Sequence, residues 1–343
     1  MHYSSQQAKL YPIAQHLQSH SQLIYGCMGL GGGWNTNTIS SDDIKQAQAV
    51  IETCLEQDIK IFDHADIYTF GKAEQVFGKV LSSEPSLRDQ MSIQSKCGIR
   101  FAGKDGVKRY DFSAEWITQS VDNILARLHI EQLDVLMLHR PDPLADMEAL
   151  VDTLSTLHRA GKIKHIGMSN MHVQQLIRFQ ALLPLPIICN QIELSLGHLA
   201  GINDAIEPSH HYDGMFEHAE THDIQIQAWG ALFQGQFTKE MSNDVSVNVR
   251  HTVNLISELA QKYKVSKEAI VLAFLTRLPN AIQPIIGTTN LERIVRCAEV
   301  KSCLLSHVDW YSLLESARGR YDIQPDMMVT AKAITSGAQP LGA

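Results

Sequence analysis

Apolar runs of strand length alternate with helix-like patterns along most of this chain. After each run, apolar residues return at helical spacing, which predicts an amphipathic helix. The first such set is Ile44, Ala47, Ile51 and Leu55, behind the helix-start segment Ser40–Asp43. The runs that predict strands are Leu23–Leu30 (ending in a glycine loop), Ile59–Phe62, Met91–Lys96, Leu133–Leu138, Ile163–Met168, Pro186–Cys189, Ile224–Ala228 and Ile282–Ile286.

Helices are expected in most of the intervals and beyond the last strand. They are Glu74–Leu81, a long helix capped by Ser113, Met147–Ala160, Val173–Leu183, Met215–Thr221, Val249–Tyr263, Lys267–Arg277, Leu291–Glu299 and Val308–Arg318. About eight strand-then-helix units predict an α/β protein with a single (β/α)₈ TIM barrel and an extra C-terminal helix. We expect a flexible leader over 1–22, the barrel over 23–325 and a loose tail over 326–343.

A doubly wound sheet is the main competing fold. It usually carries GxGxxG after its first strand, and the segment Gly29–Gly33 does not have that spacing. The phosphate-binding pattern GxxxxGK[ST] is also absent from the sequence. The barrel is therefore the favoured fold.

Composition narrows the function classes. The chain of 343 residues has a net charge of −8 and no basic stripe, so it predicts neither a nucleic-acid partner nor a membrane surface. Its six cysteines are scattered without CxxC, which is typical of reduced thiols in the cytoplasm. Sixteen histidines invite a metal site, but His210, His211, His218 and His222 show no ligand motif and are expected in a solvated loop. The sequence leaves the oligomeric state open.

Polar or aromatic residues follow six of the expected strands. Strand ends are often polar, so a cap at Asp63, a solvated Lys96 or a turn histidine at His139 would each be unremarkable alone. In a (β/α)₈ barrel, however, the carboxyl ends of all strands meet at one rim. A functional site there is therefore expected. The residues, in strand order, are Asp63, Lys96, His139, Ser169 with Asn170, Gln191 and Trp229.

Three of these residues, Asp63, Lys96 and His139, suit proton transfer together with Tyr68. Tyr68, in the loop behind Asp63, is a weak acid with an ordinary pKa of about 10. A nearby Lys96 ammonium would favour the phenolate and make the phenol usable near neutrality. Asp63 would hold Lys96, and His139 would bind the same substrate oxygen. Such a group suits protonation of an alkoxide as a carbonyl is reduced.

The remaining strand-end residues suit a nicotinamide. Trp229 offers a flat face on which an aromatic ring can stack. Ser169, Asn170 and Gln191 supply hydrogen-bond donors and acceptors for a carboxamide.

At these residues the chain resembles an aldo-keto reductase, in the bacterial branch usually labelled predicted oxidoreductases. The resemblance runs in the family's order from about Ile24 to Tyr321. It implies an NAD(P)H-dependent carbonyl reductase of one barrel, without a metal, acting on a small-molecule carbonyl substrate. The matching motifs are Phe62–Tyr68, Gly71–Glu74, Ser95–Ile99, Leu138–Leu144, Gly161–Asn170, Asn190–Gln191 and Pro284–Gly287.

Carried over residue by residue, the resemblance implies a catalytic tetrad of Asp63, Tyr68, Lys96 and His139, with Tyr68 as the proton donor. It implies that loops after strands seven and eight hold the pyrophosphate and adenosine, and that Arg293 lies near the 2′-phosphate. NADP(H) is favoured, but the segment Gly287–Asn290 lacks a lysine common in relatives, so NAD(H) stays possible. The implied cofactor residues are Ser169, Asn170, Gln191, Trp229, Gly230, Leu232, Gly287, Thr288 and Arg293.

Departures from the family pattern concern the substrate mouth. His64 stands where threonine is commoner, and Phe70 stands where a glycine-rich loop is frequent. We expect both to reshape the mouth. Trp34, after the first strand's glycines, is expected to be either a substrate wall or a loop anchor. The substrate itself is not identified by the sequence.

The sequence leaves two other functions open. Some proteins of this fold are regulatory subunits of potassium channels that bind NADPH as redox sensors with little turnover, and an intact tetrad does not exclude that role. A metal-dependent barrel hydrolase is the third possibility, which chelator-sensitive activity would support.

Overall fold

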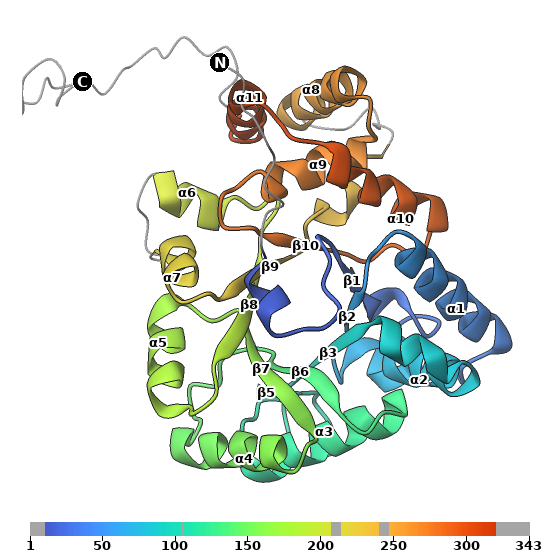
Figure 1. The fold of residues 1–343 in the computed structure, drawn as a ribbon, viewed down its shortest axis with the longest axis vertical. Coiled ribbons are helices and arrows are strands. Elements are labelled where there is room, and N and C mark those ends of the chain that lie inside the picture. The colour runs from blue at the N-terminus through green and yellow to red at the C-terminus, as the bar shows by residue number, and fades with distance from the viewer. Residues whose placement is uncertain (1–10, 105, 207–213, 240–246, 320–343) are drawn as a thin grey trace, which may run out of the picture.

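A closed barrel of parallel strands forms the centre of the molecule, with helices around it (Figure 1). The computed structural model describes residues 11–104, 106–206, 214–239 and 247–319. The strands neighbour one another in the order β1, β10, β9, β8, β7, β6, β3, β2, and β2 pairs with β1 to close the ring. The predicted (β/α)₈ barrel is confirmed. Its strands are β1 Ile24–Gly26, β2 Ile61–Asp63, β3 Ser92–Cys97, β6 Leu133–Leu138, β7 Ile163–Ser169, β8 Ile187–Glu193, β9 Gln225–Trp229 and β10 Gln283–Ile286.

The helices that the sequence predicts begin close to their expected positions, whereas α6 lies in an interval for which no helix was predicted. Ser40 and Asp43 form a reciprocal capping box at the start of α1, and Ser113 caps α3 by accepting from Trp116 N. The extra C-terminal helix is α11, which lies beside α8 outside the ring (Figure 1). The helices are α1 Ser41–Glu56, α2 Lys72–Ser83, α3 Ala114–Leu128, α4 Met147–Arg159, α5 Val173–Leu182, α6 Ala200–Ile206, α7 Met215–Thr221, α8 Val247–Tyr263, α9 Lys267–Thr276, α10 Leu291–Ala298 and α11 His307–Ala317.

Residues 11–22 differ from the expected flexible leader. Pro12–Gln15 forms a short 3₁₀ helix, η1, whose Ile13 is fully buried. Ile13 packs in one apolar cluster with Ile24 and Ile61, the first residues of β1 and β2. The segment therefore closes the barrel at the amino ends of its strands. Residues 1–10 of the leader and the tail over 326–343 lie outside the described residues.

Hydrogen bonds from three barrel strands fasten this segment in place. In each case a side chain near the start of a strand contacts a backbone carbonyl of residues 16–21. The Gln- and Ser-rich composition of the segment predicts a loose leader. Its backbone carbonyls nevertheless accept the hydrogen bonds that buried polar side chains of the barrel require. The contacts are Ser92 Oγ to Ser19 O at 2.9 Å, Gln283 Nε2 to Ser21 O at 2.5 Å and His165 Nε2 to His16 O at 3.0 Å.

A small antiparallel hairpin after β3 was not expected from the sequence. It pairs β4 (Ile99–Arg100) with β5 (Arg109–Tyr110), and Phe101 follows β4 directly. The strands have only two residues each, too short to give an alternating pattern.

Within the described part of the chain, no helix is both long enough and apolar enough to cross a membrane. All six cysteines are buried free thiols.

Candidate active site

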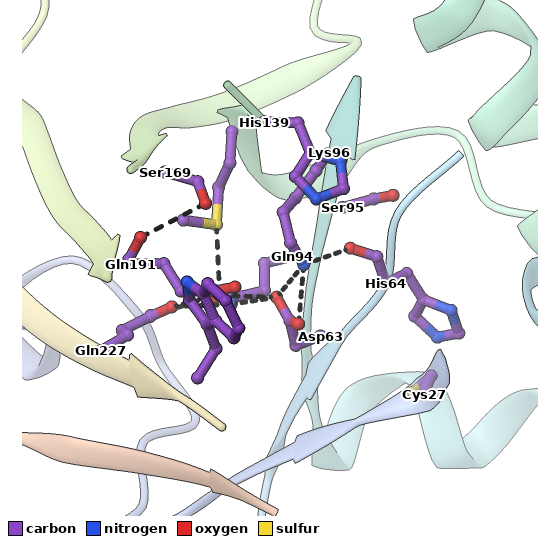
Figure 2. Close-up of polar contacts among 12 residues, drawn as sticks. Cys27, Asp63, His64, Gln94, Ser95, Lys96, His139, Ser169, Gln191 and Gln227 are labelled. Atoms are coloured by element: carbon purple, nitrogen blue, oxygen red, sulfur yellow. Dashed lines mark hydrogen bonds and ion pairs between the residues drawn. The ribbon is translucent and has the colours of Figure 1, made fainter. Parts of the chain in front are cut away.

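A buried ion pair between Asp63 and Lys96 lies at the centre of the site. Asp63 ends β2, and Lys96 lies on the neighbouring strand β3. The ammonium nitrogen is 2.7 Å from each carboxylate oxygen and 2.8 Å from the carbonyl oxygen of His64 (Figure 2). The Lys96 side chain is 1% exposed and the Asp63 side chain 2%. Because a buried charge is costly unless it is paired and hydrogen-bonded, these contacts fix the ammonium in one position.

Tyr68 lies beside this ion pair, in the short helix η3 (Tyr68–Gly71) that follows β2. Lys96 Nζ is 4.9 Å from the centre of the phenol ring. Burial raises the pKa of Tyr68, the positive charge of Lys96 lowers it, and the Asp63 carboxylate raises it again. Lys96 therefore favours the phenolate, as expected, but burial outweighs it and the pKa ends above its usual value. Tyr68 is a phenol at neutral pH, the form that donates a proton.

His139 faces Tyr68 from the end of β6. The two rings meet almost at right angles, 83°, with centres 6.2 Å apart. Burial, followed by the positive charges of Lys96 and Arg140, holds the pKa of His139 well below its usual value. The imidazole is therefore neutral, and its Nδ1 has no hydrogen-bond partner among the described residues. The other ring nitrogen, Nε2, is not among the buried atoms and also has no hydrogen-bond partner among the described residues, so it can bind a substrate oxygen.

The residues expected at the nicotinamide gather next to His139. Asn170 Nδ2 donates to His139 O at 3.1 Å and to Ser169 Oγ at 2.8 Å. Asn170 Oδ1 accepts from Trp229 Nε1 at 2.9 Å, which fixes the indole at the end of β9. Asn170 has a left-handed backbone, with φ of 60°, where asparagine is better tolerated than most residues. An oriented aromatic face next to amide and hydroxyl groups fits a nicotinamide with its carboxamide.

Gln191 links this cofactor side to the ion pair. It is 2% exposed, and its Nε2 donates to Asp63 Oδ1 at 3.0 Å and to Gln227 Oε1 at 3.1 Å. Gln191 Oε1 accepts no hydrogen bond from the described residues. That oxygen can therefore accept from the N–H of a ligand amide.

The expected phosphate end contains a cation that sequence reasoning missed. Arg293 Nη2 donates to Thr238 Oγ1 at 2.9 Å, and Arg293 Nε lies 3.3 Å from Glu268 Oε1. The side chains of Arg293 and Lys239 both approach Gly235. A Cβ atom placed on this glycine would be 3.1 Å from Arg293 Nη2 and 3.3 Å from Lys239 Cε, so Lys239 lies beside Arg293. In sequence Lys239 is indistinguishable from any exposed surface lysine.

The other expected cofactor residues also lie in the loops at this end of the barrel. Gly230 and Leu232 follow β9, and Gly287 and Thr288 follow β10. Gly230 has a positive φ of 70°. Thr288 O accepts from the hydroxyl of Tyr25 at 3.2 Å, which ties the loop to β1.

His64 does not shape the substrate mouth, contrary to expectation. Its carbonyl faces Lys96, while its ring is turned away from Lys96 and is completely buried (Figure 2). The ring packs edge-on against Phe77 at 4.7 Å. Burial, helped by the charge of Lys96, lowers the pKa of His64 to about 3, so the ring is neutral.

Phe70 does lie at the rim, in an exposed aromatic cluster with Trp34 and Phe101. The ring of Phe70 is 5.5 Å from each of the other two. The three side chains are 51%, 48% and 40% exposed in the order Phe70, Trp34, Phe101. Phe70 has φ of 60°, a strained backbone for an aromatic residue, and its loop also contains Tyr68. Trp34 therefore belongs to a rim surface that includes Phe70, two residues after Tyr68.

A second buried network supports β3 from behind. Ser95, next to Lys96, donates to Glu74 Oε1 at 2.6 Å, and Arg127 Nε donates to Glu74 Oε2 at 2.7 Å. Asp66 lies nearby, and burial together with the charge of Glu74 raises its pKa to about 7. These groups join α2 and α3 to the strand that carries Lys96.

Only His218 and His222 of the histidine-rich segment belong to the part of the chain that the structure describes. His210 and His211 lie outside the described residues, and the rings of His218 and His222 are 4.2 Å apart on α7 and just behind it. Among the described residues no group of three or more His, Cys, Asp or Glu side chains is placed to hold a metal ion.

Comparison with known proteins places the chain in one family. Residues 22–316 match the model of the aldo/keto reductase family. The chain is 30% identical over 281 residues to the oxidoreductase YdhF of Escherichia coli, covering 81% of this chain and 89% of that one. It is 31% identical over 309 residues to a 6-dehydroglucose reductase of Agrobacterium fabrum, covering 88% and 95%. A glycerol dehydrogenase from Gluconobacter oxydans shares the fold, with a TM-score of 0.73, 22% identity, and coverage of 90% and 95%.

Proposed function

The chain belongs to the aldo/keto reductase family, and from that membership we propose that it reduces aldehydes or ketones to alcohols with NAD(P)H. The observation that carries this proposal is the position of Tyr68 next to both the fixed Lys96 ammonium and the neutral imidazole of His139. A phenol close to a cation and to a neutral hydrogen-bonding ring suits protonation of a carbonyl oxygen.

In this mechanism a bound reduced nicotinamide supplies the hydride. Tyr68 donates its proton to the substrate oxygen, and the Lys96 charge stabilises the phenolate that remains. His139 binds the same oxygen and polarises the carbonyl. Asp63 touches no substrate: it holds Lys96.

We further propose NADPH as the preferred cofactor. Arg293 and Lys239 lie together at the expected adenosine end, and a 2′-phosphate would bring two negative charges to them. Glu268 shares the charge of Arg293, which makes the preference for NADPH moderate rather than absolute.

The rim cluster supports a substrate with an apolar or aromatic-stacking face. Trp34, Phe70 and Phe101 present exposed rings next to the loop of Tyr68. The relative named as a 6-dehydroglucose reductase makes aldehydo sugars a second class, since their C–H faces also pack on aromatic rings.

The deciding experiment is a panel of aromatic aldehydes, ketones and aldehydo sugars, followed by the absorbance loss of NADPH and, separately, NADH. Steady turnover of carbonyl compounds without any partner protein supports the reductase. Tight NADPH binding with no turnover across the panel would contradict it and favour the redox-sensing subunit instead. A chelator is added to one set of reactions, because loss of activity there would favour metal-dependent chemistry.

A further inference from the structure

Three buried glutamines form a hydrogen-bonded ring with Asp63 inside the barrel (Figure 2). Gln94 lies on β3, Gln191 on β8 and Gln227 on β9, and they are 0%, 2% and 0% exposed. Only Gln191 is expected at the cofactor. Gln94 and Gln227 have no role in the mechanism above, although burying an amide is costly unless its hydrogen bonds are made.

The ring is closed by four hydrogen bonds. Gln94 Nε2 donates to Asp63 Oδ1 at 2.6 Å and to Gln227 Oε1 at 2.8 Å. Gln191 Nε2 donates to the same two acceptors at 3.0 and 3.1 Å. A fifth bond, from Gln227 Nε2 to Gln94 Oε1 at 2.9 Å, pairs these two amides across the barrel.

The chemistry of the groups allows one orientation for each amide. An ionised carboxylate only accepts, so Gln94 and Gln191 must turn their NH₂ groups toward Asp63. Both NH₂ groups also face Gln227, which must therefore present its oxygen to them. With its NH₂ group held inward by two acceptors, Gln191 directs its oxygen away from the ring, where it can accept from the carboxamide N–H of a nicotinamide.

We propose that Gln94 and Gln227 are positioning residues of the reductase: together they lock the Gln191 amide in its acceptor orientation toward the nicotinamide, and Gln94 also shares the negative charge of Asp63 next to Lys96. This inference rests on the proposed function, because it assigns the ring a purpose in nicotinamide binding and proton transfer. It goes beyond that function by adding two residues that touch neither substrate nor cofactor.

The barrel itself supplies matched controls. Gln225 lies on β9 two residues before Gln227 and is equally buried, but it donates to the backbone oxygens of Ala281 and Ile226, at 2.6 and 3.0 Å. Its amide makes no hydrogen bond to Asp63 or Gln191 among the described residues. A substitution at Gln225 therefore tests the cost of removing a buried amide without disturbing the ring.

The first test measures binding rather than turnover. Calorimetry compares NADP⁺ with 2′-phospho-ADP-ribose, which lacks the nicotinamide, on the full chain and its Gln227→Met and Gln225→Met variants. Gln227→Met should weaken NADP⁺ about tenfold, the worth of one hydrogen bond, and leave the nicotinamide-free fragment unchanged. Gln225→Met should change neither. Equal weakening of both ligands by Gln227→Met, or no weakening, would overturn the inference.

Gln94→Met provides a second test that does not depend on the first variant folding. It removes a donor from Asp63, and since the Asp63 charge raises the pKa of Tyr68, that pKa should rise further. Alcohol oxidation, which needs the phenolate, should then follow a pH curve displaced to higher pH relative to Gln225→Met. Coincident curves would contradict the charge-sharing role. A wild-type protein that neither binds NADP⁺ nor turns over would instead overturn the proposed function.

Discussion

The two ends of the barrel interior contain similar residues and use them differently. At the lower end, where the strands begin, Gln225 and Gln283 donate to backbone carbonyls, and Ile13 of η1 fills the apolar space. At the upper end, where the strands finish, Gln94 and Gln227 bind each other, and Gln94 also binds Asp63. Both layers are equally buried.

The difference lies in what the amides hold. The side chains of the lower layer bind backbone carbonyls or fill apolar space, so the loss of one should lower the stability of the fold without changing the rate of the reaction. Upper-layer side chains hold an ionised group and a ligand-facing oxygen, so their loss should alter proton transfer and cofactor binding. The residues that close the barrel thus lie at one end of its axis, and the residues of the candidate site lie at the other. This is expected where the site is at the carboxyl ends of the strands.

Lys96→Met should have the largest combined effect on activity and stability, because Lys96 lies at the centre of the upper layer. It removes the cation that lowers the pKa of Tyr68, so kcat should fall by ~10²-fold or more. It also leaves the Asp63 carboxylate buried without a cation, at a cost of about 3–5 kcal/mol in unfolding free energy. Activity assays and denaturant unfolding measure the two effects.

Lys162→Met is the control for that experiment. Lys162 pairs with Asp122 at the surface, and exposed pairs contribute about 0–1 kcal/mol. A loss of activity as large as that of Lys96→Met would show that lysine removal acts through general instability.

Ile13→Ala should do the reverse at the lower end. Truncating a fully buried isoleucine lowers the unfolding free energy by about 2–5 kcal/mol. At a temperature where the variant stays folded, kcat and KM should match those of the wild type. An unchanged melting temperature would mean that η1 does not close the barrel. An altered kcat would contradict the inference that the lower layer affects stability alone.

The upper layer should also give a flat pH profile for reduction. The pKa of Tyr68 is raised and that of His139 lies well below its usual value of about 6.5, so neither group changes charge between about pH 6.5 and 9. The kcat of reduction at saturating cofactor should be level over that range. A bend near pH 6.5 would show that His139 titrates during turnover.

Phe70→Ala should have the smallest effect, because Phe70 lies at the rim above both layers. Removing its ring opens the cluster with Trp34 and Phe101, so KM for substrates with an apolar face should rise several-fold, or ~1 kcal/mol, while kcat changes little. Steady-state kinetics with one large and one small aldehyde checks this. Equal effects on both substrates would place Phe70 outside the substrate mouth.

Much of this structure is predictable from the sequence because the end of each strand is marked by a change from apolar to polar residues. The positions of Asp63, Lys96 and His139 follow from where apolar runs stop. Ile13 was missed because isolated apolar residues in a polar leader give no periodic signal. Gln94 and Gln227 were missed because a polar residue within a strand usually faces water, and only barrel closure turns these two inward.

Local pattern also failed where the direction of a side chain decides its role. His64 follows Asp63 directly, so the next peptide turns its ring to the other side of the strand, toward Phe77. Its carbonyl, rather than its ring, serves the site. Lys239 reaches Arg293 through the loop after β9, whose path the sequence does not specify.

The most direct test of the account is the Tyr68→Phe variant, because it removes one oxygen and leaves the ring in place. NADPH-dependent reduction of the best carbonyl substrate should fall by ~10²–10⁴-fold, the usual contribution of a positioned acid. NADPH affinity, measured by calorimetry on the same preparation, should match that of the wild type. A variant that binds NADPH normally and keeps nearly full turnover would contradict the assignment of Tyr68 as the proton donor.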